Sequence, residues 1–422
     1  MFGSLPEVGE KSGYNARAMH RQNGHRRHSE LIILLGALTA FAPVSIDMYL
    51  PALPTIGAAF GAEPGRVQLS LASFFLGLAT GQAFYGPISD RFGRKRPLYA
   101  GLALFTMASA GCALAASIDT LIVLRFFQAL GACSGQVIAR AVVRDLFEAR
   151  ESARVFSLLL LVMGVSPILA PLVGGQIIGW FEWQAVFWVI TALGLVGLAG
   201  VAMRLPETHR HEHKRSLHLR KVASVYYELL KDRTFIGYAL TGGLAMAGLY
   251  TYIVGTPFVF IELFHVPADR FGFFFGANAI GLITAAQLNV RLVRHHDTDT
   301  IIQKVLLVEL ATGILLLIGV AFGLIGLYGT AVLLFIYIAS VGCLFPNTTA
   351  MAMAAHGNKA GSASALVGTL QFTLAAIAAS AVGAANNGTA LPMAAVIASC
   401  GASAFLFYYG LVRTRMLVAP IR

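Results

Sequence analysis

A charged stretch lies between two apolar runs and decides the fold: Gly86-Pro87-Ile88-Ser89-Asp90-Arg91-Phe92-Gly93-Arg94-Lys95-Arg96-Pro97-Leu98. The residues on its two sides, 68–88 and 98–117, are almost continuously apolar. Each run has about the 20 residues that a helix needs to cross the ~30 Å hydrocarbon core of a bilayer. A transmembrane strand would instead alternate apolar and polar residues. We therefore expect the charged stretch to connect two membrane-spanning helices.

Apolar runs of this length recur along the whole chain. Hydrophobic residues make up 57% of the 422 residues and charged residues only 12%, about half the share found in soluble proteins. Polar residues are thus too few to coat a water-soluble particle of this size. We predict an all-α membrane protein with twelve transmembrane helices, at 31–53, 68–88, 98–117, 120–142, 155–177, 184–204, 235–259, 271–290, 301–321, 327–349, 361–384 and 390–412.

The longest break between apolar runs, residues 205–234, divides the predicted helices six and six. It is rich in basic and other polar residues, as expected for a loop outside the membrane. We therefore predict two six-helix bundles joined by a loop. The predicted parts are a basic tail at 1–30, an N-terminal bundle at 31–204, the loop at 205–234, a C-terminal bundle at 235–412 and a second tail at 413–422.

The basic residues predict the orientation. If the N-terminus is cytoplasmic, 28 of the 31 lysines and arginines lie on cytoplasmic segments. Only Arg66 and Arg270 then lie in outer loops, and Arg125 lies inside a helix. This distribution follows the positive-inside rule, so both termini are predicted to be cytoplasmic. The net charge of +11 does not indicate a nucleic-acid partner, because the basic residues are scattered over these connections.

Three ionisable residues lie inside predicted helices: Asp47, Arg125 and Glu309. Each costs roughly 2.5–3.5 kcal/mol at the bilayer centre on insertion scales, so each should face the protein interior or a water-filled cavity. Glu309 lies near the middle of the ninth helix. For Glu309 we favour a structural role, with the carboxylate against neighbouring polar groups.

Asp47 and Arg125 are predicted to lie at nearly the same depth, because both are a similar number of residues from the outer ends of their helices. Gln128 follows Arg125 by three residues and shares its helix face. Two interpretations are open. These residues form a proton-coupling or substrate site, or Asp47 and Arg125 form a buried ion pair that only fixes helix packing. Ionisable groups inside membranes usually mark transport pathways, which favours the first.

No motif predicts catalysis or a cofactor. The four cysteines lie singly in apolar runs, and none of the eleven histidines lies in mid-helix. These positions do not indicate a disulfide framework, a metal site or haem ligation. The chain lacks HExxH and a Walker A motif, and Gly131-Ala132-Cys133-Ser134-Gly135 misses the GxSG pattern of rhomboid-type proteases. We therefore predict a transporter rather than an enzyme, with no metal and no cofactor.

The charged stretch closely resembles the GxLaDrxGrkxxl signature of the major facilitator superfamily. It also lies between the second and third helices, where that family carries it. The matching residues are Gly86, Asp90, Arg91, Gly93 and Arg94. The fourth helix contains Arg125-Phe126-Phe127-Gln128-Ala129-Leu130-Gly131, which is similar to the family's RxxQG motif. The fifth contains Pro167 and then Ala170-Pro171-Leu172-Val173-Gly174-Gly175, which is similar to the GPxxGG antiporter motif with Ala170 for its first glycine.

The first helix resembles one subfamily, the bicyclomycin-resistance (Bcr/CflA) drug exporters. The similar stretches are Pro43-Val44-Ser45-Ile46-Asp47-Met48-Tyr49-Leu50-Pro51-Ala52-Leu53-Pro54, Val143-Arg144-Asp145-Leu146 and Leu205-Pro206-Glu207-Thr208. The resemblance covers residues 31–412. It implies a proton-driven exporter of drug-like molecules that works by alternating access. It also implies that helices 1, 4, 7 and 10 line a central cavity, which Asp47 and Arg125 face.

The same resemblance implies a cytoplasmic gate. Asp90 would face the N-terminus of helix 11 near Gly361 and Ser362, where the helix dipole favours an anion. Arg94 would pair with Asp145. Five residues are candidates for lining the cavity: Tyr49, Tyr250, Tyr252, Asn278 and Gln371. For the last four, hydrogen bonding between helices is an equally open interpretation.

The expected partners are a small drug-like substrate, protons as the coupling ion and the lipid bilayer. We expect a functional monomer in the bacterial inner membrane. An importer or exporter of a metabolite such as a sugar or an amino acid is the alternative within the same fold. A channel or a purely structural membrane protein is less favoured, because neither needs Asp47 and Arg125 at matched depth.

Overall fold

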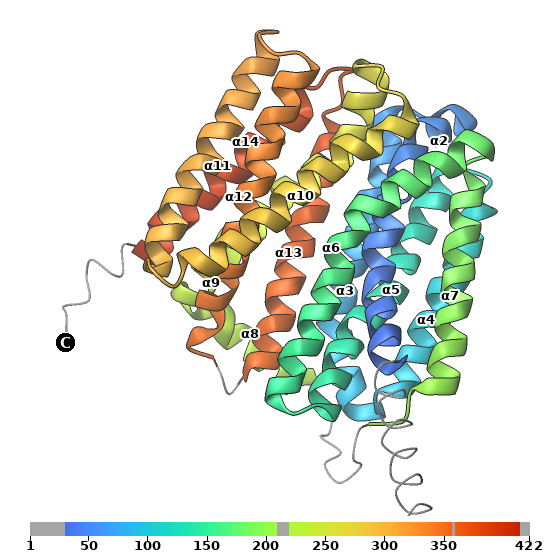
Figure 1. Cartoon of the computed structure of the whole chain (residues 1–422), viewed down its shortest axis with the longest axis vertical. Helices are drawn as coiled ribbons and strands as arrows, with labels where there is room; N and C mark the ends of the chain where they lie inside the picture. Colours follow the sequence, from blue (N-terminus) through green and yellow to red (C-terminus); the bar gives the residue numbers. More distant parts are fainter. Residues whose placement is uncertain (1–29, 209–218, 357–358, 414–422) are drawn as a thin grey trace, which may run out of the picture.

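The computed structural model describes residues 30–208, 219–356 and 359–413, and most of these are helical. Figure 1 shows two groups of helices, blue to green for the first half of the chain and yellow to red for the second. The first group contains a helix that begins at Glu30 and continues through η1 (Leu50–Ala52) into α2 (Leu53–Phe60), then α3 (Pro64–Phe92), α4 (Lys95–Ala113), α5 (Ile118–Leu146), α6 (Ala149–Trp180) and α7 (Gln184–Arg204). The second contains α9 (Arg233–Thr256) with η3 (Pro257–Leu263), α10 (Ala268–Leu292), α11 (Thr298–Ala321), α12 (Leu327–Ala354), α13 (Ala360–Ala384) and α14 (Leu391–Phe407) with η5 (Tyr408–Arg413).

Eleven helices among the described residues are long and apolar enough to cross a membrane. The twelfth is α4, which has 19 residues and packs between α5 and α7. Its first two residues are Lys95 and Arg96, which leaves a shorter apolar run than in the other helices. Each predicted apolar run coincides with one of these twelve helices. The prediction of two six-helix membrane bundles is therefore confirmed.

The segment between the two bundles is not only a loop. Residues 205–234 were expected to form a connection, but they contain the helix α8 (Leu219–Lys231). Val225, Tyr226 and Leu229 are the less exposed residues of this helix, and their spacing places them on one face. The sequence-based prediction missed α8 because its 13 residues are too short to span a membrane and its apolar residues are interspersed with charged ones. The predicted tails at 1–30 and 413–422 lie outside the described residues, except for Glu30 and Arg413.

One end of the molecule, which we call the basic end, contains the start of the first helix and the junction of α14 with η5. There Glu30 forms an ion pair with Arg204 at the end of α7. At the same end Asp299 accepts hydrogen bonds from the Tyr238 hydroxyl at 2.7 Å and the Tyr408 hydroxyl at 3.0 Å. Polar contacts thus tie the helix ends of each bundle together. We call the opposite end, where α2 and η3 lie, the far end (Figure 1).

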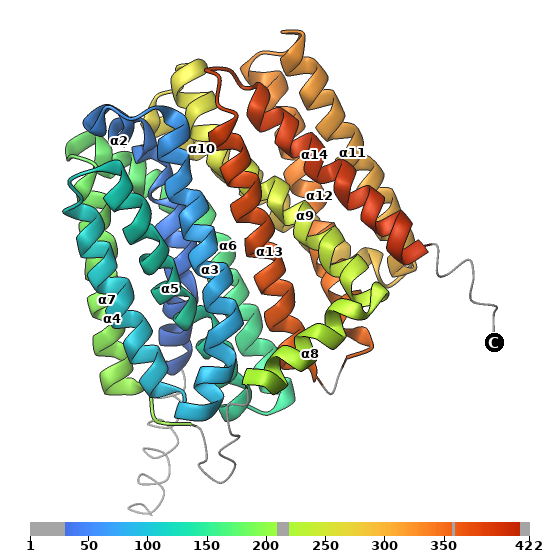
Figure 2. The ribbon, with the colours of Figure 1, turned by 180° about the vertical axis from the view of Figure 1, so that it is seen from behind.

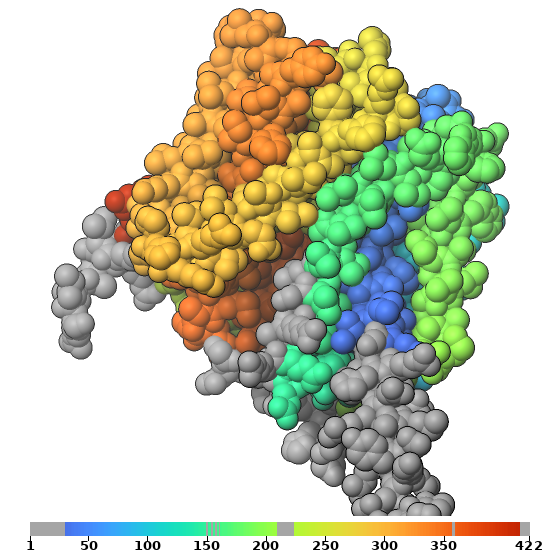
Figure 3. All heavy atoms as spheres, viewed as in Figure 1, coloured from blue at the N-terminus to red at the C-terminus, as the bar shows by residue number. Residues whose placement is uncertain are grey.

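The two bundles meet along two helix pairs, α3 with α13 and α6 with α10, and α3 and α13 run side by side in Figure 2. At the far end the contacts are made by glycines. A Cβ atom on Gly65 of α3 would overlap the carbonyl oxygen of Gly383 of α13, and one on Gly175 of α6 would lie 2.8 Å from the carbonyl oxygen of Ala268. Figure 3 shows the surfaces of α6 and α10 in contact on this side of the molecule. The absence of side chains therefore lets the bundles touch backbone to backbone.

The first helix is interrupted at Asp47. Regular α-helix runs over residues 30–47 and is followed by a turn and the short 3-10 segment η1. Pro51 and Pro54 have no N–H to donate to the carbonyls one turn before them, so the α-helical ladder cannot continue through this segment. Tyr49 and Ala52 instead donate to carbonyls three residues back, at 3.2 and 3.0 Å. The break leaves Asp47 at the end of a helix inside the protein.

Candidate substrate and proton site

Arg125 lies on α5 and is completely buried in the N-terminal bundle. Its Nη1 donates to the carbonyl oxygen of Ser45 at 3.0 Å and to Oε1 of Gln128 at 2.6 Å. Gln128 in turn donates through Nε2 to the hydroxyl of Ser109 on α4 at 2.8 Å. These bonds join the first, third and fourth helices of the bundle around one positive charge. Arg125 and Gln128 thus share a helix face and a hydrogen bond, and the shared face is what their spacing predicts.

Aromatic rings, rather than a carboxylate, surround the Arg125 guanidinium. Its carbon lies 4.2 Å from the ring centre of Phe74, 4.4 Å from that of Tyr49 and 6.0 Å from that of Phe187. Its Nε and Nη2 have no hydrogen-bonding partner. Cation–π attraction is strong in a site that excludes water, so these rings stabilise the buried charge.

Asp47 and Arg125 lie at the same level, because Arg125 contacts Ser45 and Tyr49 on either side of Asp47. The predicted matching of depth therefore holds, but among the described residues the two form no ion pair. Ser45 and Tyr49 are four residues apart and share the helix face toward Arg125, whereas Asp47, two residues from each, points away from it. The alternative of a structural Asp47–Arg125 pair is therefore not what the structure contains.

Asp47 is buried, with only 3% of its surface exposed, and its Oδ2 has no hydrogen-bonding partner. Its side chain lies near those of Tyr250 and Tyr252, which are on α9 of the other bundle. Asp47 therefore lies between the bundles rather than inside one of them. A buried carboxylate without donors is expected to hold a proton unless water reaches it.

The four candidates from the C-terminal bundle form two hydrogen-bonded pairs. Gln371 of α13 donates to the Tyr250 hydroxyl at 3.4 Å, and Asn278 of α10 donates to the Tyr252 hydroxyl at 2.9 Å. The Tyr250 ring also packs against Phe75 of α3, with ring centres 4.6 Å apart, and so bridges the two bundles. The hydrogen bonds between helices are thus real, and they lie beside Asp47. A role of these side chains in lining a cavity stays a prediction.

Tyr49, the fifth candidate, belongs to a different group of contacts. Its side chain is fully buried and its hydroxyl shares a hydrogen bond of 2.7 Å with the Ser70 hydroxyl of α3. Its ring is one of those that flank Arg125. Tyr49 therefore supports Arg125, and the sequence alone does not distinguish this role from contact with a substrate.

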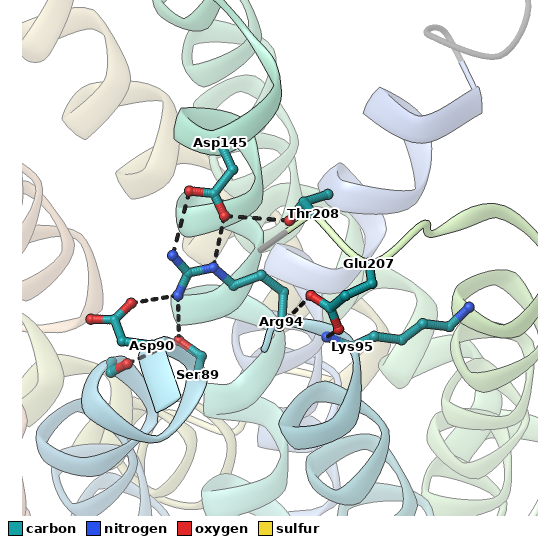
Figure 4. Close-up of polar contacts among 8 residues, drawn as sticks. Ser89, Asp90, Arg94, Lys95, Asp145, Glu207 and Thr208 are labelled. Atoms are coloured by element: carbon teal, nitrogen blue, oxygen red, sulfur yellow. Dashed lines mark hydrogen bonds and ion pairs between the residues drawn. The ribbon is translucent and has the colours of Figure 1, made fainter. Parts of the chain in front are cut away.

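A second polar centre, which we call the Arg94 cluster, lies at the basic end and is drawn in Figure 4. Arg94 donates from Nε to Asp145 at 2.8 Å and from Nη1 to Asp90 at 2.6 Å and the Ser89 hydroxyl at 2.9 Å. Arg94 and Asp145 are thus paired, as the family resemblance implies. Burial lowers the pKa of Arg94, but its hydrogen bonds to Asp145 and Asp90 and their charges outweigh this, so the pKa is raised. The guanidinium therefore stays charged at any physiological pH.

Glu207 is the member of this cluster that the sequence analysis did not single out. Its carboxylate accepts the backbone N–H groups of Arg94 at 2.9 Å and Lys95 at 3.2 Å, and so caps the start of α4 (Figure 4). Gly93 has φ +84°, and a Cβ atom there would lie 2.8 Å from the Glu207 carboxylate. An acidic residue just after a helix in a Leu-Pro-Glu-Thr stretch gives no local signal for this contact, since its partners are over a hundred residues away.

The predicted contact of Asp90 with helix 11 is not present. Asp90 forms an ion pair with Arg94 of its own bundle, and 55% of its side chain is exposed. Gly361, at the start of α13, has no atom within 4 Å of the position of a Cβ. The reason is that the Asp90 carboxylate pairs with Arg94, one turn further along its own bundle. Of the remaining motif residues, Gly86 is also open to a Cβ, and Arg91 lies over the Phe92 ring at 5.1 Å.

The fifth-helix motif lies on α6 where three helices converge. α6 passes through Pro167 and Pro171 as a helix. A Cβ atom on Gly174 would overlap the carbonyl oxygen of Met48, next to Asp47, and Gly175 faces the start of α10. The motif thus connects the Asp47 segment with the other bundle. Glu309 lies elsewhere, inside the C-terminal bundle, and Tyr337 is its polar neighbour.

The described residues contain no group of three His, Cys, Asp or Glu side chains that could hold a metal.

Comparison with known proteins shows that the chain is similar to a family of membrane transporters. A family model described as Major Facilitator Superfamily matches residues 35–380. The MFS-type transporter YdgK of Bacillus subtilis is 36% identical over 401 residues, which is 94% of this chain and 99% of the relative. The bicyclomycin resistance protein homolog of Haemophilus influenzae is 32% identical over 90% of this chain and 95% of the relative. The multidrug resistance protein MdtL of Escherichia coli is 32% identical over 56% of this chain and 59% of the relative.

Solved structures share the fold at low sequence identity. A bacterial homolog of the human lysosomal transporter Spinster, in an inward-facing and occupied conformation, has a TM-score of 0.72 at 15% identity and covers 93% of this chain and 99% of that one. A D-xylose–proton symporter has a TM-score of 0.68 at 16% identity and covers 92% of this chain and 97% of that one.

Proposed function

Because the chain belongs to the major facilitator superfamily, we propose that it exports drug-like small molecules in exchange for protons. It is a multi-pass membrane transporter, and its substrate is a small molecule. Relatives whose matches cover 90% and 56% of the chain are named for resistance to bicyclomycin and to several drugs, which supports drugs as the substrate class. This assignment agrees with the Bcr/CflA resemblance of the first helix.

Asp47 is the observation that carries the proton-coupling part of the proposal. It is a buried carboxylate with an unpartnered oxygen, at a break in the first helix and facing α9 of the other bundle. A group at this boundary meets water only when the bundles part on one side. Hydration favours the ionised carboxylate and dehydration favours the protonated one, so rocking of the bundles loads and unloads a proton.

The proposed orientation places the basic end in the cytoplasm of a bacterial inner membrane, with both termini there. This follows the positive-inside rule. The far end, closed by the glycine contacts of α3 with α13 and α6 with α10, then faces outward. Asp90 is not in contact with α13 at the cytoplasmic end. We therefore assign the structure to an inward-facing state of the transport cycle.

The cycle follows from these positions. In the inward-facing state described here Asp47 is still buried and keeps its proton. When the basic end opens further and water reaches Asp47, the proton leaves to the cytoplasm and the drug binds between the bundles. The bundles then rock, the far end opens and the drug leaves. Asp47 takes a proton from the outside, and the neutral carboxyl allows the bundles to close again. The Arg125 guanidinium is held in place by its aromatic shell throughout the cycle, and its positive charge attracts or repels a charged substrate that binds nearby. We propose that a single chain performs this cycle.

Transport into inside-out or reconstituted vesicles under an imposed proton gradient tests the proposal. The panel of probes consists of bicyclomycin, chloramphenicol and a cationic dye, with a sugar and an amino acid as comparison substrates. We expect drug movement that a proton uncoupler abolishes and that Asp47→Asn loses. Asp119→Asn, at an exposed ion pair of the far end, is the matched control. Wild-type rates with Asp47→Asn would contradict the coupling role, and uptake of only the sugar or amino acid would contradict drug export.

A further inference from the structure

Glu309 is a buried carboxyl group that the proposed mechanism does not use. It lies on α11, with none of its surface exposed, and neither carboxylate oxygen has a hydrogen-bonding partner. The ionisable groups that face it are the Tyr337 hydroxyl from α12 and the Cys400 thiol from α14. Tyr337 approaches Glu309, but its own hydrogen bond runs to the carbonyl oxygen of Ile397 at 3.3 Å.

An ionised Glu309 cannot be accommodated in these surroundings. A carboxylate has about four acceptor sites, and a buried one needs donors or a cation to offset its lost hydration. Among the described residues no ion pair includes Glu309, and the neighbouring donor, the Tyr337 hydroxyl, is bonded to the carbonyl oxygen of Ile397 instead. The protonated, neutral form of Glu309 therefore has the lower free energy in these surroundings. In this state of the protein Glu309 is a neutral carboxylic acid.

Glu309 and Tyr337 occupy positions equivalent to those of Ser109 and Arg125 in the other bundle. The second and fourth helices of the two bundles are joined by equivalent amide pairs, Gln82–Gln136 at 3.0 Å and Asn289–Asn347 at 2.8 and 3.1 Å. About three turns before these amides along the fourth helices lie Arg125 and Tyr337. Each contacts a polar residue on the third helix of its bundle: Ser109 through Gln128 in one, and Glu309 in the other.

Glu309 is also connected to the helix that faces Asp47. A Cβ atom on Gly248 of α9 would overlap the Tyr337 hydroxyl, so Tyr337 is packed tightly against that helix. Gly248 is two residues before Tyr250, whose ring spans the boundary between the bundles. Contacts thus run from Glu309 through Tyr337 to α9 and from there to Asp47. A change of charge at Glu309 would displace groups on this path.

We propose that Glu309 is a second proton-binding site of the transport cycle. It rests on the proposed proton coupling and adds a second carboxyl to it. In the state described here the carboxyl O–H bond is intact. When α9 shifts and water enters the bundle, that bond breaks, the proton goes to water and the carboxylate remains. The return movement gives the carboxylate a proton from water again.

Protonation of Glu309 is tested first, without any transport assay. Purified protein in lipid is treated with a carbodiimide that modifies protonated carboxyls in apolar surroundings, and the modified residues are located by mass spectrometry. We expect modification of Glu309 at neutral pH. Infrared spectra should show a protonated-carboxyl band that Glu309→Gln removes and Glu182→Gln, at an exposed turn, does not. A carboxylate band that disappears instead would overturn the proposal.

The cycle role is tested by the proton count. The steady drug gradient that reconstituted protein sustains against a known proton gradient gives the protons exchanged per drug. We expect Glu309→Gln, which keeps the shape of a neutral carboxyl, to fold and transport with one proton fewer than wild type. The drug concentration ratio across the membrane should then be smaller than in wild type by a factor equal to the proton concentration ratio. An unchanged gradient in Glu309→Gln would overturn the second site.

The two proposals fail in different ways. If wild-type protein moves no drug in response to protons, the proposed function fails while carbodiimide modification still reports on Glu309. Glu309→Ala serves as the packing control, because it removes both the proton and the volume. Loss of folding in Glu309→Ala together with wild-type coupling in Glu309→Gln would show a purely structural residue.

Discussion

At the scale of single residues, the protein stabilises a buried positive charge without using its buried negative one. Arg125 is flanked by Phe74 and Tyr49, and each such contact contributes roughly 0.5–2 kcal/mol. Together with the bonds from Nη1, this is comparable to the ~2.5–3.5 kcal/mol that a charge costs in the middle of a membrane. Asp47 is therefore free of Arg125, and its protonation depends on access to water, as the proposed coupling role requires.

The first prediction concerns the shape of the cation at this position. Arg125→Lys keeps the charge but replaces a planar group that stacks on rings by a compact ammonium. We expect drug transport to fall by about tenfold or more, because an unstacked charge loses more than ~1.4 kcal/mol of interaction. Transport in vesicles and thermal unfolding in detergent check this. Arg66→Lys, at an exposed ion pair, is the control and should be neutral. Equal rates for both variants would contradict the role of the aromatic shell.

The second prediction concerns Gly93. Its backbone, at φ +84° and ψ 173°, is a conformation that costs a residue with a side chain about 1–3 kcal/mol. A Cβ would also press on the Glu207 carboxylate. Gly93→Ala should therefore lower the thermal unfolding temperature of the purified protein. Gly86→Ala, seven residues earlier and facing open space, is the matched control. A larger loss at Gly86 than at Gly93 would show that the strain lies elsewhere.

At the scale of elements, the sequence predicts what the bilayer imposes. A membrane-spanning helix must satisfy every backbone group itself and match the hydrocarbon thickness, so apolar run length alone located all twelve helices. The amphipathic α8 lies outside that constraint, and the apolar pattern missed it. Contacts between distant segments, such as Glu207 with the start of α4 or Gly65 with Gly383, leave no local pattern. Arg94–Asp145 was predictable only because the family resemblance supplied it.

The third prediction follows from the cap on α4. Glu207 accepts two backbone N–H groups that the helix itself cannot satisfy, and it does so as a charged acceptor. Glu207→Gln should cost about 1–2 kcal/mol of stability at the basic end. Hydrogen exchange of residues 93–98, followed by mass spectrometry, should rise in this variant and remain unchanged in Glu182→Gln. Slower or equal exchange in Glu207→Gln would mean that the cap is not what orders this turn.

At the scale of the whole molecule, the two ends differ in how the bundles meet. Glycines bring backbones into contact at the far end, while at the basic end Asp90 remains with Arg94 of its own bundle. The sequence predicted the Asp90 contact with helix 11 because the motif is read as a complete gate. A sequence contains every contact of a transport cycle at once, whereas one structure contains those of one state. Under the proposed cycle, the expected contact would form in the state in which the basic end is closed.

The last prediction tests whether the far-end glycines are what holds that end closed. The Gly65→Val side chain would overlap the carbonyl oxygen of Gly383. Because that oxygen belongs to the backbone and cannot turn away as a side chain could, α3 and α13 must separate there. Spin labels at Glu63 and Thr389, near the far ends of these two helices, should then report longer distances, and drug transport should fall because the closed far end is less populated. Gly361→Ala, at the basic end of α13 where nothing is within 4 Å, should leave both measurements unchanged. If the Gly65→Val distances equal those of wild type, the closure rests on the α6–α10 contact at Gly175 instead, and Gly175→Val becomes the variant that must open the far end.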